Sequence, residues 1–135
     1  AVLQLETHVF SQQKRMRELM APYGTRLMAW APLAEGRNGI FTHPTLTAIG
    51  TKYGKTAAQT ALRFLMAEDV IAIPKSVHRE RLVENFSIDD FELSAEDLDA
   101  IRALDGGKPM FADFNDPTLA KFLLEYDAKF NPERQ

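Results

Sequence analysis

The stretch from Val70 to Asn85 reads VIAIPKSVHRERLVEN. Its first four residues are apolar and predict a short buried strand, which Pro74 ends because proline has no N–H to give to a sheet. Lys75 and Ser76 follow directly, just before a predicted helix over 78–86. In a parallel α/β fold this is the place where ligands bind, and the N–H groups at a helix start favour an anion.

The predicted helix carries Arg81 and Asn85 one turn apart, so that they share a face. We expect the Arg81 guanidinium to converge with the Lys75 ammonium, the Ser76 hydroxyl and the helix N–H groups on one phosphate. A lysine or an arginine taken alone would be interpreted as a solvated surface charge. The complete pattern, with cations and a hydroxyl between a strand and a helix, favours phosphate binding.

Two more strands are predicted before this unit, at 2–6 and 26–30, and the third covers 70–73. Helical patterns alternate with the strands, each with a start or stop signal; they run from Ser11 to Gly24, from Pro44 to Gly54, from a Thr56 cap to Leu65, and from a Ser94 cap to Leu104. Strands that alternate with helices predict a parallel sheet in an α/β fold.

A parallel sheet of three strands is small for an independent domain. Both faces of parallel strands are normally covered, and three strands leave two open edges. One strand and helix per roughly 25 to 45 residues fits a (β/α)8 barrel, whose eight units take about 250 residues. The pattern therefore predicts a slice of such a barrel.

The composition indicates one globular domain. The chain has 135 residues, of which 45% are hydrophobic, and a net charge of −3. This acidic balance argues against a nucleic-acid-binding protein, and no apolar run approaches the roughly 20 residues of a membrane span. We therefore expect no nucleic-acid or membrane partner and a cytoplasmic location. Without cysteines, and with His8, His43 and His78 far apart, no metal site is expected.

Residues 73–88 resemble the C-terminal signature of the aldo-keto reductases. The residues in register with that signature are Pro74, Lys75, Ser76, Arg81, Glu84 and Asn85. The likeness covers nearly the whole chain: residues 4–8 resemble the sixth strand of the family's barrel, 29–33 the seventh strand, 52–59 the seventh helix and 91–97 the beginning of the last helix. Trp30, the run 35–38 and Asp116-Pro117 are most similar to prokaryotic members of the diketogluconate-reductase type.

This resemblance implies the fold and the domain limits. Residues 1–107 would be the C-terminal portion of a (β/α)8 TIM barrel, with about three parallel strands and flanking helices. Residues 108–135 would be a tail with a short helix from Asp116, whose apolar pattern is Leu119, Phe122, Leu123 and Tyr126. Two alternatives stay open for Phe111, Phe114 and this helix: packing under the barrel, or forming a wall of the substrate site.

The resemblance also implies an NADP(H) site. Taken from nicotinamide to adenine, the expected contacts are Trp30 stacked on the nicotinamide, Gln4 on its carboxamide, Ala31, Leu33 and Glu35 along the pyrophosphate, Lys75, Ser76 and Arg81 on the adenosine 2′-phosphate, and Glu84 and Asn85 on the adenine. Ala31 replaces the serine common in the family, which removes one hydroxyl contact. Taken alone, Trp30 would be interpreted as a core residue, and Gln4 fits a hydrogen-bonded barrel residue equally well.

The implied reaction is the reduction of a small aldehyde or ketone to an alcohol. The family's catalytic tyrosine, lysine, aspartate and histidine belong to the first four strands, so no catalytic residue is assigned here. Tyr23, Tyr53 and Tyr126 do not replace the missing tyrosine. We expect the chain alone to be inactive, and its open edges to be covered by the missing N-terminal part of the barrel or by self-association.

Ala1 stands almost inside a predicted strand, so we expect the chain to be a fragment or a truncated product of a longer protein. A second hypothesis comes from another class of protein. It is a non-catalytic half-barrel that binds a nucleotide or serves in assembly, and that pairs with another chain to cover its edges.

Overall fold

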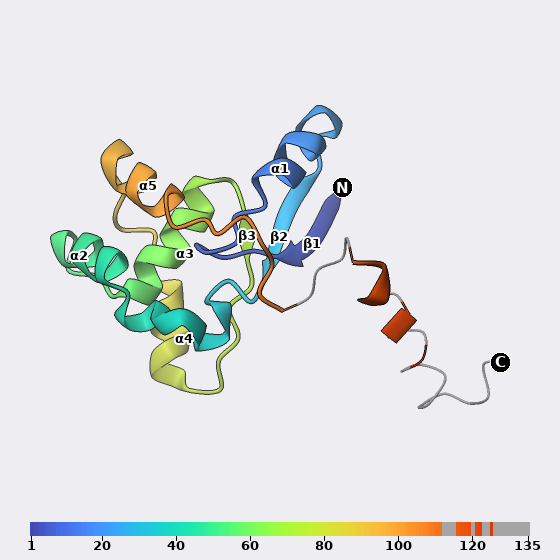
Figure 1. The fold of residues 1–135 in the computed structure, drawn as a ribbon. Helices are drawn as coiled ribbons and strands as arrows, with labels where there is room; N and C mark the ends of the chain where they lie inside the picture. The colour runs from blue at the N-terminus through green and yellow to red at the C-terminus, as the bar shows by residue number, and fades with distance from the viewer. Residues whose placement is uncertain (112–115, 120, 123–124, 126–135) are drawn as a thin grey trace.

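The computed structural model describes residues 1–111, 116–119, 121–122 and 125. Strands and helices alternate along the chain, as predicted (Figure 1). Their order is β1 (Val2–Glu6), α1 (Lys14–Met20), the 3-10 helix η1 (Ala21–Tyr23), β2 (Arg26–Trp30), the 3-10 segment η2 (Ala34–Thr42), α2 (Pro44–Lys52), α3 (Ala57–Ala67), β3 (Ile71–Ala72), α4 (Arg79–Phe86) and α5 (Ala95–Arg102).

The three strands form one parallel sheet with β2 in the middle, which confirms the predicted sheet. β1 and β2 pair along their full length, from Val2 opposite Arg26 to Glu6 opposite Trp30. The two strands therefore end at the same level, and the loops that follow them leave from the same end of the sheet.

β3 is shorter than the strand predicted over 70–73, and it pairs with β2 only at Ile71 and Ala72. The N–H of Val70 bonds to the carbonyl of Leu65 in α3 at 2.9 Å, so Val70 closes that helix instead of joining the sheet. Pro74 has no N–H with which to extend the ladder. The N–H of Ile73 still reaches the carbonyl of Ala29 in β2 at 3.4 Å, so the contact with β2 ends between Val70, which closes α3, and Pro74, which has no N–H.

Two predicted helix starts are confirmed. The Thr56 hydroxyl accepts the N–H of Gln59 at 3.2 Å, and the Gln59 side-chain oxygen accepts the N–H of Thr56 at 3.0 Å, which completes a capping box at the start of α3. The Ser94 hydroxyl accepts the N–H of Asp97 at 3.2 Å and caps α5.

The helix start predicted after Ser11 is wrong. Ser11 and His8 exchange backbone hydrogen bonds of 3.0 and 3.1 Å and form an isolated bridge. Gln13 then takes a left-handed conformation, with φ at 53°, and its side chain donates to the carbonyl of Glu6 at 2.8 Å. These bonds hold residues 11–13 outside the helix, so α1 begins at Lys14.

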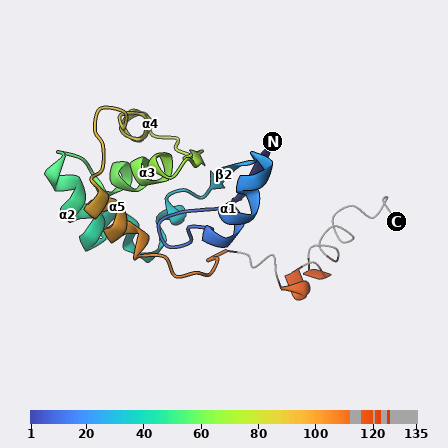
Figure 2. The same ribbon diagram turned by 90° about the horizontal axis from the view of Figure 1, so that it is seen from above.

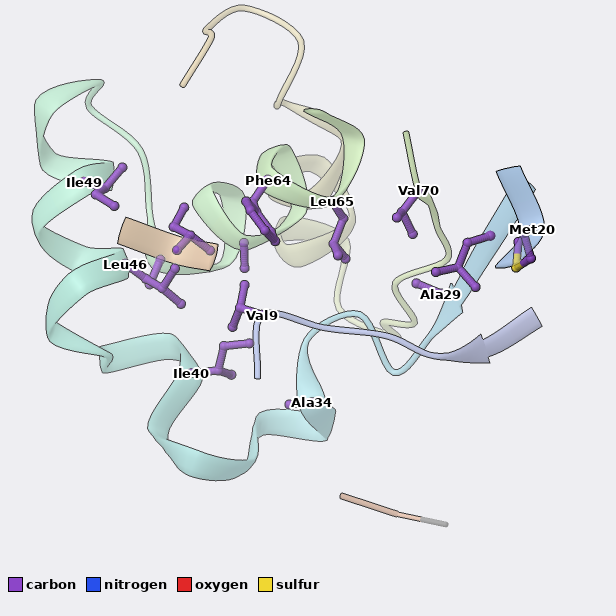
Figure 3. Close-up of a cluster of buried hydrophobic side chains, with 14 residues drawn as sticks. Val9, Met20, Ala29, Ala34, Ile40, Leu46, Ile49, Phe64, Leu65 and Val70 are labelled. Atoms are coloured by element: carbon purple, nitrogen blue, oxygen red, sulfur yellow. The ribbon is translucent and has the colours of Figure 1, made fainter. Parts of the chain in front are cut away.

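Helices cover one face of the sheet. On β2, Leu27 and Ala29 are buried, and they join α3 residues Phe64 and Leu65 in the main core (Figure 3). The side chains of the other face alternate with these, and Gln4 of that face is exposed. In a closed barrel this second face would be the interior.

Charged side chains join the outer helices. Glu68, just beyond α3, forms ion pairs with Arg17 of α1 at 2.7 Å and with Arg102 of α5 at 2.5 Å. Burial raises the pKa of Glu68, but hydrogen bonds from both guanidinium groups outweigh burial and hold this pKa below its ordinary value. The carboxylate is therefore ionised at neutral pH and links three helices.

Part of the tail is described: residues 117–119, 121–122 and 125 are helical. Phe114, Leu123 and Tyr126, which belong to the predicted tail pattern, lie outside the described residues. Among the helices that the structure describes, none has the length and apolar character to cross a membrane.

Candidate functional site

The loop after β3 and the helix α4 line a cavity of about 370 Å³. The cavity also borders the start of α3, against which α4 packs (Figure 2), and the loop after β2. Six of the residues expected to contact a cofactor line it: Leu33, Lys75, Ser76, Arg81, Glu84 and Asn85. The cavity thus lies beyond the carboxyl ends of parallel strands, where α/β folds bind their ligands.

Ser76 stabilises the turn that leads into α4. Its hydroxyl accepts the N–H of His78 at 3.1 Å, and the helix begins one residue later at Arg79. Arg81 and Asn85 then lie one turn apart, and both line the cavity. The i, i+4 spacing therefore places both side chains on one face of α4, as the sequence predicts.

Two of the lining side chains are exposed cations. Neither Lys75 nor Arg81 forms an ion pair with any residue that the structure describes. Glu84 is the carboxylate of the same lining, and it accepts a hydrogen bond of 2.6 Å from the Thr56 hydroxyl. Since the cations exceed the carboxylate in number, the cavity favours an anion that can bind both of them, such as a phosphate.

Three lining residues were not predicted as site residues: Phe41, Thr56 and Ala58. Phe41 leaves 52% of its surface exposed, and a Cβ at Gly36 would lie only 3.2 Å from its ring. In the sequence, Phe41 is an aromatic residue that follows a loop with two glycines, and this is the feature that could have indicated a place in the cavity lining. Thr56 was predicted only as a helix cap, because its bond to Glu84 depends on how α3 meets α4.

Four of the expected cofactor residues do not line this cavity: Gln4, Trp30, Ala31 and Glu35. Gln4 is exposed near the middle of β1, and Trp30 ends β2. Ala31 and Glu35 lie two residues before and two residues after the cavity residue Leu33, in the segment that follows β2. The structure therefore separates the expected contacts into a group at α4 and a group at the ends of β1 and β2.

The loop after β2 is tightly wound. Ala31 and Glu35 both have φ at 49°, and the N–H of Gly36 bonds to the carbonyl of Leu33 at 2.9 Å. The left-handed region costs an L-residue about 1–2 kcal/mol. Backbone strain of this kind concentrates in loops that hold ligands, which fits the expected place beside a pyrophosphate.

Trp30 contacts the C-terminal segment. The ring centroids of Trp30 and Phe111 are 5.5 Å apart, with the ring planes tilted by 54°. The guanidinium carbon of Arg37 lies 4.5 Å from the centroid of the Phe111 ring. Of the two alternatives left open for Phe111, the structure favours a position at the strand ends, beside the expected nicotinamide residue.

Comparisons with known proteins cover most of the chain. Residues 1–106 match the profile of the "Aldo/keto reductase family". A relative from Mycobacterium sp. (strain KMS), named "Aldo-keto reductase", is 42% identical over 113 residues, which are 84% of this chain and 40% of the relative. The methylglyoxal reductase DkgA of Escherichia coli (strain K12) is 36% identical over 110 residues, which are 82% of this chain and 40% of that protein.

Solved structures agree with the sequence comparisons. A mutant of Gox0644, solved in complex with NADPH, superposes with a TM-score of 0.79 at 36% identity, covering 85% of this chain and 42% of that one. The predicted partial (β/α)8 barrel is thereby confirmed. The chain spans about 40% of the length of the curated relatives it matches.

Proposed function

The chain belongs to the aldo/keto reductase family, and from that premise we propose that it is the NADP(H)-binding part of a reductase that converts aldehydes or ketones to alcohols. The observation that carries the proposal is the pair of cations, Lys75 and Arg81, which share one cavity with Ser76 at the carboxyl end of the sheet. This set of donors fits the adenosine 2′-phosphate that distinguishes NADPH from NADH.

The adenosine end of the cofactor would occupy the cavity. Arg81 would hold the 2′-phosphate with paired N–H groups, Lys75 with its charge and Ser76 with its hydroxyl. Glu84 and Asn85, on the next turn of α4, would contact the adenine. The NADPH complex of Gox0644, a protein of similar structure, supports this choice of cofactor.

The nicotinamide end would lie at Trp30 and Gln4. In the sheet, Trp30 is the register partner of Glu6, and Gln4 stands on the same face of β1 as Glu6. The indole ring offers a flat apolar surface, and the Gln4 amide can both donate and accept hydrogen bonds. Backbone groups of residues 31–35 would follow the pyrophosphate. When bound, NADPH supplies the hydride for carbonyl reduction.

Neither tyrosine that the structure describes is placed to donate a proton beside Trp30. The Tyr53 hydroxyl donates to the Asp97 carboxylate at 2.7 Å and joins α2 to α5. Tyr23 comes just before β2 and therefore lies at the amino end of the sheet, whereas Trp30 lies at the carboxyl end. We propose that the chain alone is inactive, since a missing general acid costs about 10²–10⁴-fold in rate.

An open groove beside β3 supports the expectation that another part of a barrel, or another chain, covers this edge of the sheet. A groove of about 520 Å³ lies beside this edge, lined by residues of β3, α3 and α4. Much of its lining is apolar, including Leu62, Met66, Ile71, Leu82 and Phe86. Further strands of a complete barrel would cover this groove. The second candidate function, a non-catalytic half-barrel that pairs with another chain, would bury the same surface.

Trp30 is the only tryptophan of the chain, so its fluorescence tests the proposal. We expect NADPH to quench the emission of the 135-residue chain along a saturable curve, because a nicotinamide bound at the indole ring accepts its excitation. N-acetyltryptophanamide, titrated in parallel, corrects for absorption by NADPH. A linear curve that coincides with this control would contradict the proposal.

A further inference from the structure

Glu6 is a buried carboxylate at the end of β1, with 1% of its surface exposed. Its two oxygens accept hydrogen bonds from successive backbone N–H groups of the C-terminal segment. The N–H of Met110 lies 2.5 Å from Oε1 and that of Phe111 lies 3.0 Å from Oε2. The carboxylate therefore joins the end of the first strand to residues more than a hundred positions later.

His8 completes the surroundings of Glu6. Its Nε2 lies 3.0 Å from Glu6 Oε1, and its Nδ1 accepts the N–H of Phe10 at 3.2 Å. Because Nδ1 is an acceptor, the ring proton lies on Nε2 and is donated to Glu6. Burial lowers the pKa of His8, although the hydrogen bond to Glu6 opposes this effect. At neutral pH, Glu6 thus receives three hydrogen bonds and no countercharge from His8.

The fastened segment carries Phe111 onto Trp30. Besides the 5.5 Å contact with Trp30, the Phe111 ring lies 6.4 Å from the His8 ring in an edge-on arrangement, and the Arg37 guanidinium covers it at 4.5 Å. The partly buried Phe111 ring is therefore flanked by Trp30 at the end of β2, by His8 just beyond β1 and by Arg37 of η2. The backbone bonds to Glu6 fix the residue from which this ring projects.

We propose that Glu6 is a positioning residue, which fastens Met110 and Phe111 across the carboxyl ends of β1 and β2 and holds the Phe111 ring against Trp30. Phe111 then forms an aromatic wall beside the place of the nicotinamide. A carbonyl substrate that reaches this place meets an apolar ring. The part of this inference that concerns the nicotinamide rests on the proposed function, whereas the fastening itself does not.

Acrylamide quenching of the single tryptophan tests the fastening without any cofactor. Phe111→Ala exposes the indole, so we expect its quenching constant to rise about two- to threefold. Glu6→Gln replaces one acceptor oxygen by an NH₂ group that faces a backbone N–H. We expect the quenching constant of Glu6→Gln to rise by the same factor. The double variant should show no further rise, because both substitutions remove the same contact between Phe111 and Trp30.

The matched control is Glu18→Gln, which removes the same charge from an exposed position on α1 and should leave quenching unchanged. Circular dichroism shows whether each variant folds. Unchanged quenching in Phe111→Ala, or in a folded Glu6→Gln, overturns the proposal. Because no NADPH is present, this failure is distinct from a failure of cofactor binding.

Hydrogen exchange in the unaltered chain tests the same contact if Glu6→Gln does not fold. We expect the amides of Met110 and Phe111 to exchange at least about a hundredfold more slowly than unstructured amides, because both are bonded to a buried carboxylate. Exchange at the unstructured rate in both amides overturns the proposal. The exchange rates need no substitution, so they test the fastening whether or not the variants fold.

Discussion

Arg81→Ala is expected to weaken the binding of NADPH by about ten- to a hundredfold, while the binding of NADH changes less than about twofold. Arg81 lines the cavity that also contains Lys75 and Ser76, and its guanidinium forms no ion pair within the described part of the chain. A phosphate bound there would receive charge-assisted hydrogen bonds from it. NADH has no 2′-phosphate, so it loses nothing when the guanidinium is removed.

Arg79→Ala is the matched control for this prediction. Arg79 is exposed on the same helix, two residues earlier, and it does not line the cavity. The control removes the same charge, so it measures the nonspecific attraction between the chain and an anionic cofactor. Equal losses for NADPH in both variants, or equal losses for NADPH and NADH in Arg81→Ala, would contradict the assignment of Arg81 to the 2′-phosphate.

Gly50→Ala is expected to lower the free energy of unfolding by about 2–4 kcal/mol, as measured by urea denaturation. Gly50 is buried in α2, where a Cβ would lie 2.5 Å from the carbonyl oxygen of Lys55 and 2.7 Å from Oγ1 of Thr60. Neither contact is tolerable, because one atom is backbone and the other is held by a 2.9 Å bond to the carbonyl of Thr56. The substitution would push α2 away from the capped start of α3.

The sign of this effect separates packing from helix propensity. At an exposed helical position, glycine to alanine gains up to about 1 kcal/mol, and the reverse substitution costs a similar amount. Ala48→Gly, at an exposed position of the same helix, is therefore expected to cost about 1 kcal/mol. A stabilised Gly50→Ala variant would show that α2 and α3 do not meet as closely as the structure has them.

The parts of the fold that depend on neighbouring residues could be predicted from the sequence. Thr56 and Ser94 cap helices because each hydroxyl lies three residues before the N–H that it accepts. Arg81 and Asn85 reach one cavity because i, i+4 spacing places them on one helix face. These relations are fixed by local geometry and need no knowledge of tertiary contacts.

The contacts that the sequence did not reveal are one long-range contact and two short-range backbone contacts. The Glu6 carboxylate accepts hydrogen bonds from the N–H groups of Met110 and Phe111, more than a hundred residues later in the chain. Val70 was assigned to a strand, but its N–H closes α3. Ser11 has the chemistry of a helix cap, and it instead pairs with His8. In the two short-range cases, a backbone hydrogen bond to a residue three or five positions away replaces the bond that the sequence pattern predicts. In the long-range case, the pattern around Glu6 holds no information about the C-terminal segment.

The most direct measurement of the cofactor assignment compares 2′,5′-ADP with 5′-AMP as ligands of the isotope-labelled 135-residue chain, followed by NMR. The first ligand carries the adenosine 2′-phosphate without a nicotinamide, so its binding depends on neither Trp30 nor Phe111. We expect 2′,5′-ADP to bind at least about tenfold more tightly than 5′-AMP. It should also shift the amide resonances of Lys75, Ser76 and Arg81. Equal affinities, or shifts that leave these three residues unchanged, would show that the cavity at α4 does not hold the 2′-phosphate.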